Sequence, residues 1–137
     1  MVPVDEKKIL IIIEDSAILR QIAGEIAAVI GGCPGYAVKT VHAEDFSGID
    51  LLPCCAFFLG CEMPHPPSFS NVATMLDHIN LAGRRCGIFS SNGKSLKYLS
   101  SLVHDCEVAL GDSLSAKDGV PDSGAMLSWV KGIIGIL

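Results

Sequence analysis

Charged side chains are scarce in this sequence, and basic ones are the scarcest. Of 137 residues only 18% are charged, with 10 Lys and Arg against 15 Asp and Glu, for a formal net charge of -5 and a pI near 5.2. Binding to a phosphate backbone needs clustered Lys and Arg, and the sequence holds no basic stripe. We therefore expect no nucleic-acid partner.

Long hydrophobic runs are also missing, although half of the residues are hydrophobic and the mean hydropathy is +0.47. A membrane-spanning helix needs about 20 consecutive apolar residues. The longest charge-free apolar run, from Leu51 to Cys61, is much shorter and contains Pro53. At the N-terminus, Asp5 and Glu6 precede the apolar run and no cleavage site follows, so we expect no signal peptide. These patterns predict a soluble, cytoplasmic protein with no membrane partner.

The cysteines form no recognisable metal or redox pattern. There is no C-x-x-C pair, and the spacings fit no zinc site. Disulfides are rare in the cytosol, so we interpret the thiols as small, mostly buried hydrophobes. The six positions are Cys33, Cys54, Cys55, Cys61, Cys86 and Cys106.

What the sequence does contain is a regular alternation of apolar, β-branched runs with helical periodicity. Continuous apolar runs are typical of parallel strands buried on both faces. Ser16 or Asp15 is suited to cap the first helix, and Asp122 the last. We predict strands at 8–13, 36–42, 54–60, 85–89 and 107–110 (the last resuming at 113–116), and helices at 19–30, 69–79, 95–104 and 122–134, with at most one helical turn at 43–52.

Strand–helix repeats of this length predict right-handed crossovers between parallel strands. The fold class we expect is therefore α/β, a three-layer, doubly wound, five-stranded parallel sheet with strand order 2-1-3-4-5, formed by a single domain over residues 1–137. Ligands of such sheets bind beyond the carboxyl ends of the strands. The segments expected there are 14–17, 60–67, 90–94 and 115–119.

Two stretches of the sequence, each ending at or within one of these segments, resemble the flavodoxin family. Residues 50–60 are similar to that family's third strand and second flavin loop, and residues 81–93 to its fourth strand and third loop. The resemblance implies a flavodoxin-like electron-transfer protein that binds flavin mononucleotide (FMN) and meets a redox partner protein. The residues it implies for FMN are Ser16, Ala17, Gly60, Cys61, Met63, His65, Ser90, Ser91, Asn92 and Gly93.

The sequence departs from the flavodoxin pattern in the phosphate loop. That family holds the phosphate in a Gly- and hydroxyl-rich loop at the first helix N-terminus, where backbone N–H groups favour an anion. Here Ser16 supplies the only hydroxyl, and Glu14 and Asp15 add negative charge. The second loop has no aromatic residue to cover the flavin, and Met63 and His65 are the nearest substitutes. The hypothesis is thus an FMN-dependent carrier or a descendant with weakened flavin binding.

Residues 11–20 also resemble the first strand, acidic pair and first helix of response-regulator receiver domains. In that family the paired carboxylates, here Glu14 and Asp15, hold Mg²⁺. Gly60 occupies the position of the phospho-accepting aspartate, so the alternative is a degenerate interaction module. No nucleophile elbow is present. We assign no catalytic residue, favour a carrier or binding module over an enzyme, and leave the oligomeric state open.

Overall fold

The computed structural model describes residues 7–135, and the expectation that no signal peptide is present lies outside this range. The predicted alternation of strands and helices is observed. In chain order the elements are β1 (Lys7–Ile13), α1 (Ala17–Gly31), β2 (Tyr36–His42), α2 (Gly48–Leu51), β3 (Cys54–Gly60), α3 (Ser70–Leu76), β4 (Arg85–Ser90), α4 (Gly93–Val103), β5 (Ala109–Leu110), β6 (Leu114–Ser115) and α5 (Ser123–Ile134).

The strands form one parallel sheet in the order β2-β1-β3-β4-β5, which confirms the predicted α/β fold and strand order. The fifth strand comes in two pieces. Both β5 and β6 pair with β4, through Arg85 and Cys86 in one case and Phe89 and Ser90 in the other. Residues 111–113 interrupt the pairing, so this edge of the sheet is short and irregular.

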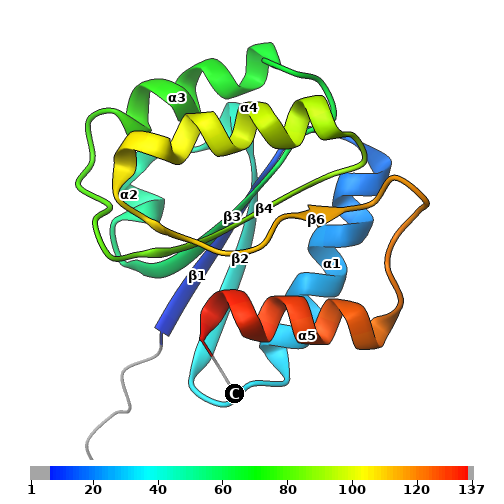
Figure 1. The fold of residues 1–137 in the computed structure, drawn as a ribbon. Coiled ribbons are helices and arrows are strands. Elements are labelled where there is room, and N and C mark those ends of the chain that lie inside the picture. The colour runs from blue at the N-terminus through cyan, green and yellow to red at the C-terminus, as the bar shows by residue number, and fades with distance from the viewer. Residues whose placement is uncertain (1–6, 136–137) are drawn as a thin grey trace, which may run out of the picture.

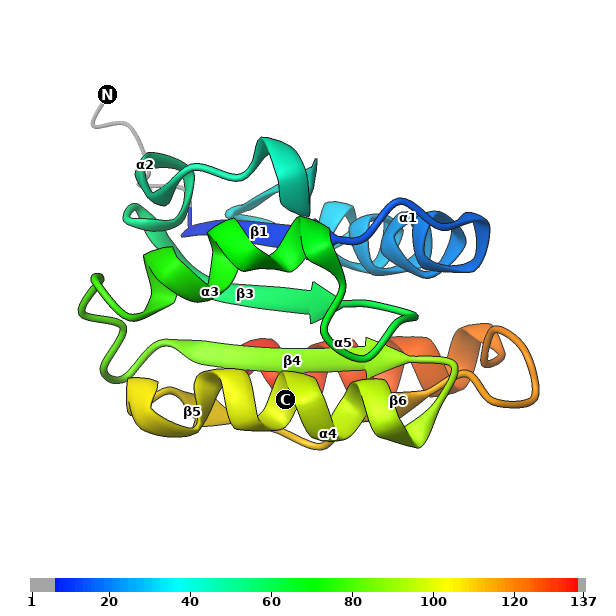
Figure 2. The ribbon, with the colours of Figure 1, turned by 90° about the horizontal axis from the view of Figure 1, so that it is seen from above.

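Both faces of the sheet are covered by helices, which explains the high hydropathy. Figure 1 shows α3 and α4 on one face and α5, with α1, on the other, and Figure 2 shows the same layers from above. In β1 the residues from Ile9 to Ile13 are at most 1% exposed. Ile9, Ile11 and Ile13 pack towards α1 and α5, while Leu10 and Ile12 pack towards α3 and α4. A strand with two buried faces needs an apolar residue at every position.

Local capping chemistry sets where three helices begin. Ser16 Oγ accepts a hydrogen bond from Leu19 N at 3.4 Å, so Ser16 and not Asp15 caps α1. Asp122 caps α5 as predicted, its Oδ1 2.8 Å from Ala125 N. Asn92 caps α4. Therefore α4 begins at Gly93, two residues before the predicted start, because an Asn side chain satisfies the first-turn N–H groups.

The prediction of a helix at 69–79 is wrong in its bounds. The α-helix α3 spans only Ser70–Leu76, and a 3₁₀ turn at Pro67–Phe69 precedes it. Prolines at 66 and 67 restrict the backbone before it, and no side chain caps its N-terminus. The apolar periodicity still reports burial correctly, since Phe69, Val72 and Leu76 are all buried.

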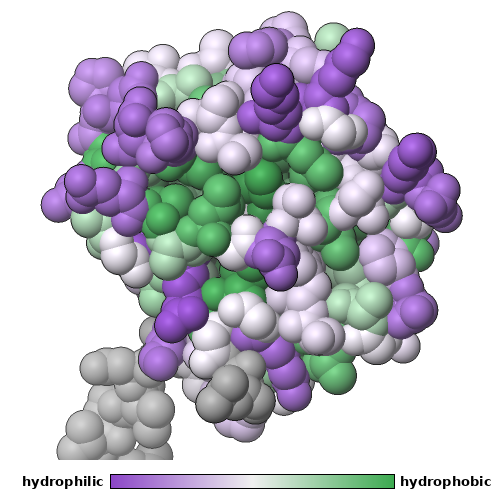
Figure 3. All heavy atoms as spheres, viewed as in Figure 1, coloured by the Kyte–Doolittle hydropathy of each residue, from purple (hydrophilic) through white to green (hydrophobic). Residues whose placement is uncertain are grey.

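The molecule leaves some apolar surface exposed. Figure 3 shows hydrophobic side chains reaching the surface in the middle of the face that carries the β5–β6 edge. Leu110 of β5 is one of five large hydrophobic residues that are well exposed in the described part of the chain. Despite this hydropathy, none of the helices within residues 7–135 is sufficiently long and apolar to cross a membrane.

The packing at Gly60 gives a first testable prediction. A Cβ added there would lie 2.4 Å from Cε2 of the buried Phe89 ring, so Gly60→Ala should lower the free energy of unfolding by about 1–3 kcal/mol. Gly24→Ala is the matched control: a Cβ at this position in α1 meets nothing within 4 Å and should raise stability by about 0.5–1 kcal/mol. Urea unfolding measures both, and equal effects would contradict the packing argument.

Candidate functional site

The carboxyl ends of β1, β3 and β4 meet at one edge of the sheet, and the residues predicted from the flavodoxin resemblance lie there. Ser16 and Ala17 begin α1, Gly60 ends β3, and Ser90 ends β4. Glu14 N donates to Gly60 O at 3.0 Å, which joins the loops that follow β1 and β3. Parallel strands place these loops side by side, so the predicted neighbourhood is correct.

A carboxylate ties the first loop to the second. The Glu14 side chain is half-buried, and its Oε1 accepts hydrogen bonds from Glu62 N at 2.7 Å and Met63 N at 3.1 Å. Hydrogen bonds to an ionised acceptor are stronger than neutral ones. Glu14 therefore satisfies two backbone donors that would otherwise be available to a ligand.

A second carboxylate, which sequence reasoning did not single out, ties the second loop to the third. The Glu62 side chain accepts from Ser91 N at 3.2 Å and from Ser91 Oγ. The Glu62 carbonyl accepts from Asn92 Nδ2 at 2.7 Å and Ser95 Oγ at 2.8 Å. Residue 62 is thus the centre of the network, and Ser91 and Asn92, both predicted as ligand contacts, are turned towards it. The only sequence signal was that Glu62 is the one acid in segment 60–67.

The first turn of α1 offers little to an anion. The Ser16 hydroxyl is used as the helix cap, and Ala17 and Ile18 follow it. Asp15 forms an exposed ion pair with Arg20 of the same helix, so its carboxylate stays beside the helix N-terminus. The N-terminal end of a helix attracts anions through its N–H groups, and a resident carboxylate opposes that attraction.

Met63 and His65, the predicted substitutes for an aromatic cover, differ in their surroundings. Met63 is 54% exposed. His65 has a left-handed backbone (φ 57°) and its ring lies 4.3 Å from the Tyr98 ring of α4, centroid to centroid. The His65 ring is therefore packed on the protein itself.

The remaining predicted residue of the second loop, Cys61, is fully buried. Burial raises the pKa of the Cys61 thiol to about 12, and the nearby Glu14 carboxylate adds to the rise. A thiol with such a pKa is almost entirely protonated at neutral pH, and the thiolate is the reactive form. Cys61 therefore packs as an apolar side chain.

The receiver-type alternative has two parts, a metal site at Glu14 and Asp15 and the absence of a phospho-accepting aspartate at Gly60. Glu14 and Asp15 have separate partners, and within residues 7–135 no group of three or more His, Cys, Asp or Glu is placed to hold a metal ion. The steric limit at Gly60 also applies to larger side chains, because Phe89 already occupies the space beside its Cα. An aspartate at this position would have to displace that ring.

A polar hollow of about 240 Å³ lies next to these acids, on the β2 side of β1. Glu14, Asp15 and Glu44 line it, together with His42 and Ser68. His42 Nδ1 and Ser68 Oγ are buried atoms with no hydrogen-bond partner in the described chain. Buried polar atoms of this kind are normally satisfied by ordered water, and the hollow has room for it.

The network predicts that Glu62 stabilises the loops. Glu62→Ala leaves Ser91 N–H without its acceptor in a part-buried position and should lower the free energy of unfolding by about 1–3 kcal/mol. Glu25→Ala is the control, since Glu25 is exposed on α1 and forms no ion pair within residues 7–135. Denaturant unfolding of both variants decides the matter, and a loss at Glu25 as large as that at Glu62 would contradict the role of the network.

Comparison with known proteins identifies the fold. No protein-family model matches the chain, and no curated protein matches it. Among solved structures, a short-chain flavodoxin associated with a PDU bacterial microcompartment aligns with a TM-score of 0.79 at 8% identity, covering 95% of this chain and 97% of that one. The flavodoxin of Streptococcus pneumoniae TIGR4 gives 0.74 at 11% identity, over 93% and 94% of the two chains.

Megasphaera elsdenii flavodoxin, in its two-electron reduced form, gives a TM-score of 0.61 at 20% identity, over 89% of this chain and 98% of that one. At such identities the likeness extends to the backbone architecture and not to the side chains of the loops. Each of these alignments covers at least 89% of both chains. The chain has the flavodoxin-like fold.

Proposed function

We propose that this protein is a flavodoxin-like binding module in which FMN affinity is strongly weakened, and that it acts through protein contacts and not as an electron carrier. One observation carries the proposal. The carboxylates of Glu14 and Glu62 already accept the backbone N–H groups of residues 62, 63 and 91. These donors lie in the two loops that, by the flavodoxin resemblance, would contact the flavin ring.

A flavin would have to replace both sets of hydrogen bonds. A hydrogen bond that involves a charged group contributes about 1.5–3 kcal/mol. Displacing the Glu14 or Glu62 carboxylate would also leave a negative charge next to the ligand, without the backbone donors that it had. The donors that the flavodoxin resemblance would assign to the flavin ring are thus satisfied internally in this chain.

The phosphate of FMN meets a similar obstacle at α1. A carboxylate a few ångströms from a phosphate costs about 1–3 kcal/mol at the dielectric constants typical of protein surfaces. Glu14 and Asp15 both precede the cap residue Ser16, whose hydroxyl is occupied. Each 1.4 kcal/mol is a factor of about ten in affinity. Glu14 therefore weakens binding by about tenfold, and Asp15 adds less because Arg20 partly neutralises it. The residues present do not fit FMN bound in the flavodoxin manner.

The same network favours a role in protein binding. It holds the start of the loop 63–67, which contains three prolines and exposes Met63 and His65. A loop that is already ordered loses little conformational entropy when a partner binds it. Methionine is enriched at protein interfaces because it is apolar and adaptable. We infer that this loop is the contact surface.

FMN titration tests the first half of the proposal. The purified protein should be colourless and should not quench FMN fluorescence saturably up to about 100 µM. Glu14→Gln combined with Asp15→Asn removes two charges, while the new amide oxygen can still accept from Met63 N, so affinity should rise at least about tenfold. The control, Asp105→Asn with Glu107→Gln, removes two exposed charges in the connection between α4 and β5. Purification of a yellow wild-type protein would overturn the proposal.

Partner capture tests the second half. Met63→Asp should abolish retention of a protein partner from cell extract, because a charge replaces the exposed apolar contact. Leu127→Asp is the matched control, since Leu127 is an exposed hydrophobic residue of α5, in the layer on the other face of the sheet. Quantitative mass spectrometry should find a protein that the wild type and Leu127→Asp retain and Met63→Asp loses. A partner lost equally with both variants would contradict the assignment of the loop.

A further inference from the structure

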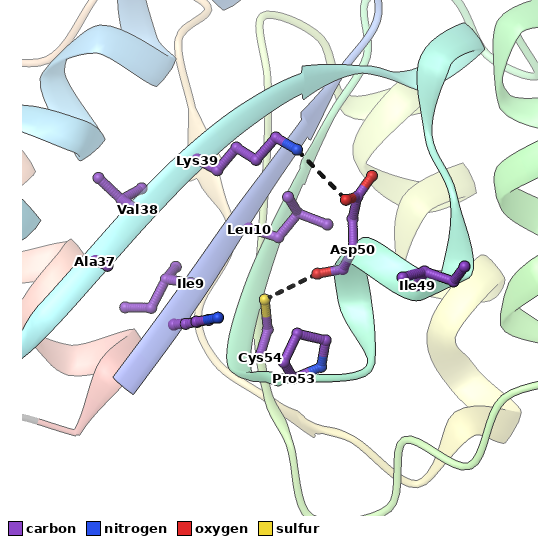
Figure 4. Close-up of a pocket in the computed structure, with 10 residues that line it drawn as sticks. Ile9, Leu10, Ala37, Val38, Lys39, Ile49, Asp50, Pro53 and Cys54 are labelled. Carbon is purple, nitrogen blue, oxygen red and sulfur yellow. Dashed lines mark hydrogen bonds and ion pairs between the residues drawn. The ribbon is translucent and has the colours of Figure 1, made fainter. Parts of the chain in front are cut away.

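A second concave site lies at the opposite, amino end of the sheet. It is a groove of about 410 Å³ between the first residues of β1 and β2 and the short helix α2 (Figure 4). Lys8 and Ala37 are the second residues of β1 and β2, and Cys54 is the first of β3. They are paired in register, so their side chains lie on the same face. Leu10 and Lys39 follow on that face, and Ile49, Asp50 and Pro53 form the opposite wall.

The groove exists because α2 is too short to cover the sheet. Only four residues, Gly48–Leu51, are helical in the connection between β2 and β3. One helical turn cannot span the width of two strands, and the apolar residues around it remain in solvent. Ile49 is 78% exposed and Leu52 is 53% exposed.

A bulge in β3 shapes the same place. Lys8 is the register partner of Cys54, but the next residue, Ile9, is the partner of Ala56. Cys55 is therefore an extra, exposed residue opposite the start of β1. Bulges change the direction of a strand and often lie beside binding sites.

The charges of the groove leave one net positive group. Lys39 Nζ lies 3.3 Å from Asp50 Oδ1, so these two neutralise each other across the groove (Figure 4). Lys8 lines the groove and forms no ion pair with any residue from 7 to 135. Lys8 is the register partner of Cys54 at the floor of the groove. Burial raises the pKa of the Cys54 thiol, and the nearby Lys8 ammonium opposes that rise.

The geometry points to a binding site for a small amphiphile with an apolar chain and a single carboxylate, a medium-chain fatty acid being the simplest example. The carboxylate pairs with Lys8, and the chain lies along Ala37 against the exposed Ile49 and Pro53 of the opposite wall. The volume is within the usual range of small-molecule sites, which are mostly apolar with a few polar groups. A single lysine with no ion-pair partner among residues 7–135, on a chain of net charge -5, favours a monoanion over a phosphate or other polyanion.

The test uses the full-length chain, labelled with ¹⁵N, and decanoate below its micelle concentration. Decanoate should give saturable shifts confined to amides around residues 8, 37, 39 and 54. Lys8→Gln should weaken binding about tenfold, since it removes the charge. Lys7→Gln is the matched control: Lys7 lies over the Tyr36 ring on the other face of the sheet, so its loss should leave the affinity unchanged. Decanol should bind more weakly than decanoate.

A second variant fills the groove. Ala37→Leu puts a larger side chain on the strand face that the ligand needs and should abolish binding, with a thermal melting curve confirming that the variant is folded. Equal effects of Lys7→Gln and Lys8→Gln, decanol binding as tightly as decanoate, or full binding by folded Ala37→Leu would each overturn the site. Should Ala37→Leu not fold, the comparison of the two lysine variants decides alone. These outcomes are separate from FMN binding and from Met63, which concern the other end of the sheet.

Discussion

The arrangement of this protein depends on one constraint: a parallel sheet with both faces buried must satisfy the backbone groups of the loops at its carboxyl end. In a ligand-binding member of this architecture, a ligand can take part of that role. Here Glu14 and Glu62 do so, because each carboxylate belongs to one loop and accepts from the next. The three loops are thus linked in series by the chain's own side chains.

Most of the fold could be predicted from the sequence because its signals are local. A continuous apolar run indicates a strand buried on both faces, and β1 is such a strand. A Ser or Asp before an apolar helical pattern marks the helix start, and Ser16 and Asp122 both cap as expected. The doubly wound parallel sheet follows from the short connections and the handedness of crossovers, and its strand order from the flavodoxin resemblance. The bounds of α3 were harder to predict. Prolines and a missing cap shorten the helix, although the apolar pattern that indicates burial continues beyond its ends.

The site was harder to predict, because its interactions join residues far apart in the sequence. Glu62 accepts from Ser91, 29 residues later, and no spacing rule connects them. Glu14 was recognised as unusual, but a sequence cannot tell a ligand-facing carboxylate from one that accepts from the backbone of another loop. The groove at the amino end was equally hidden. The groove results from the shortness of α2. In the sequence, the connection between β2 and β3 has no clear helical or strand pattern, and this predicts no groove.

These two ends of the sheet together suggest how a familiar architecture can change its use. At the carboxyl end, backbone donors of two loops are bonded to the chain's own carboxylates, which under our proposal disfavours an anionic cofactor. At the amino end, the short α2 leaves an apolar wall exposed beside Lys8, which has no ion-pair partner within residues 7–135. The carboxylates at 14 and 62 and the single turn of α2 all lie outside the buried strands, so both features are compatible with the same fold.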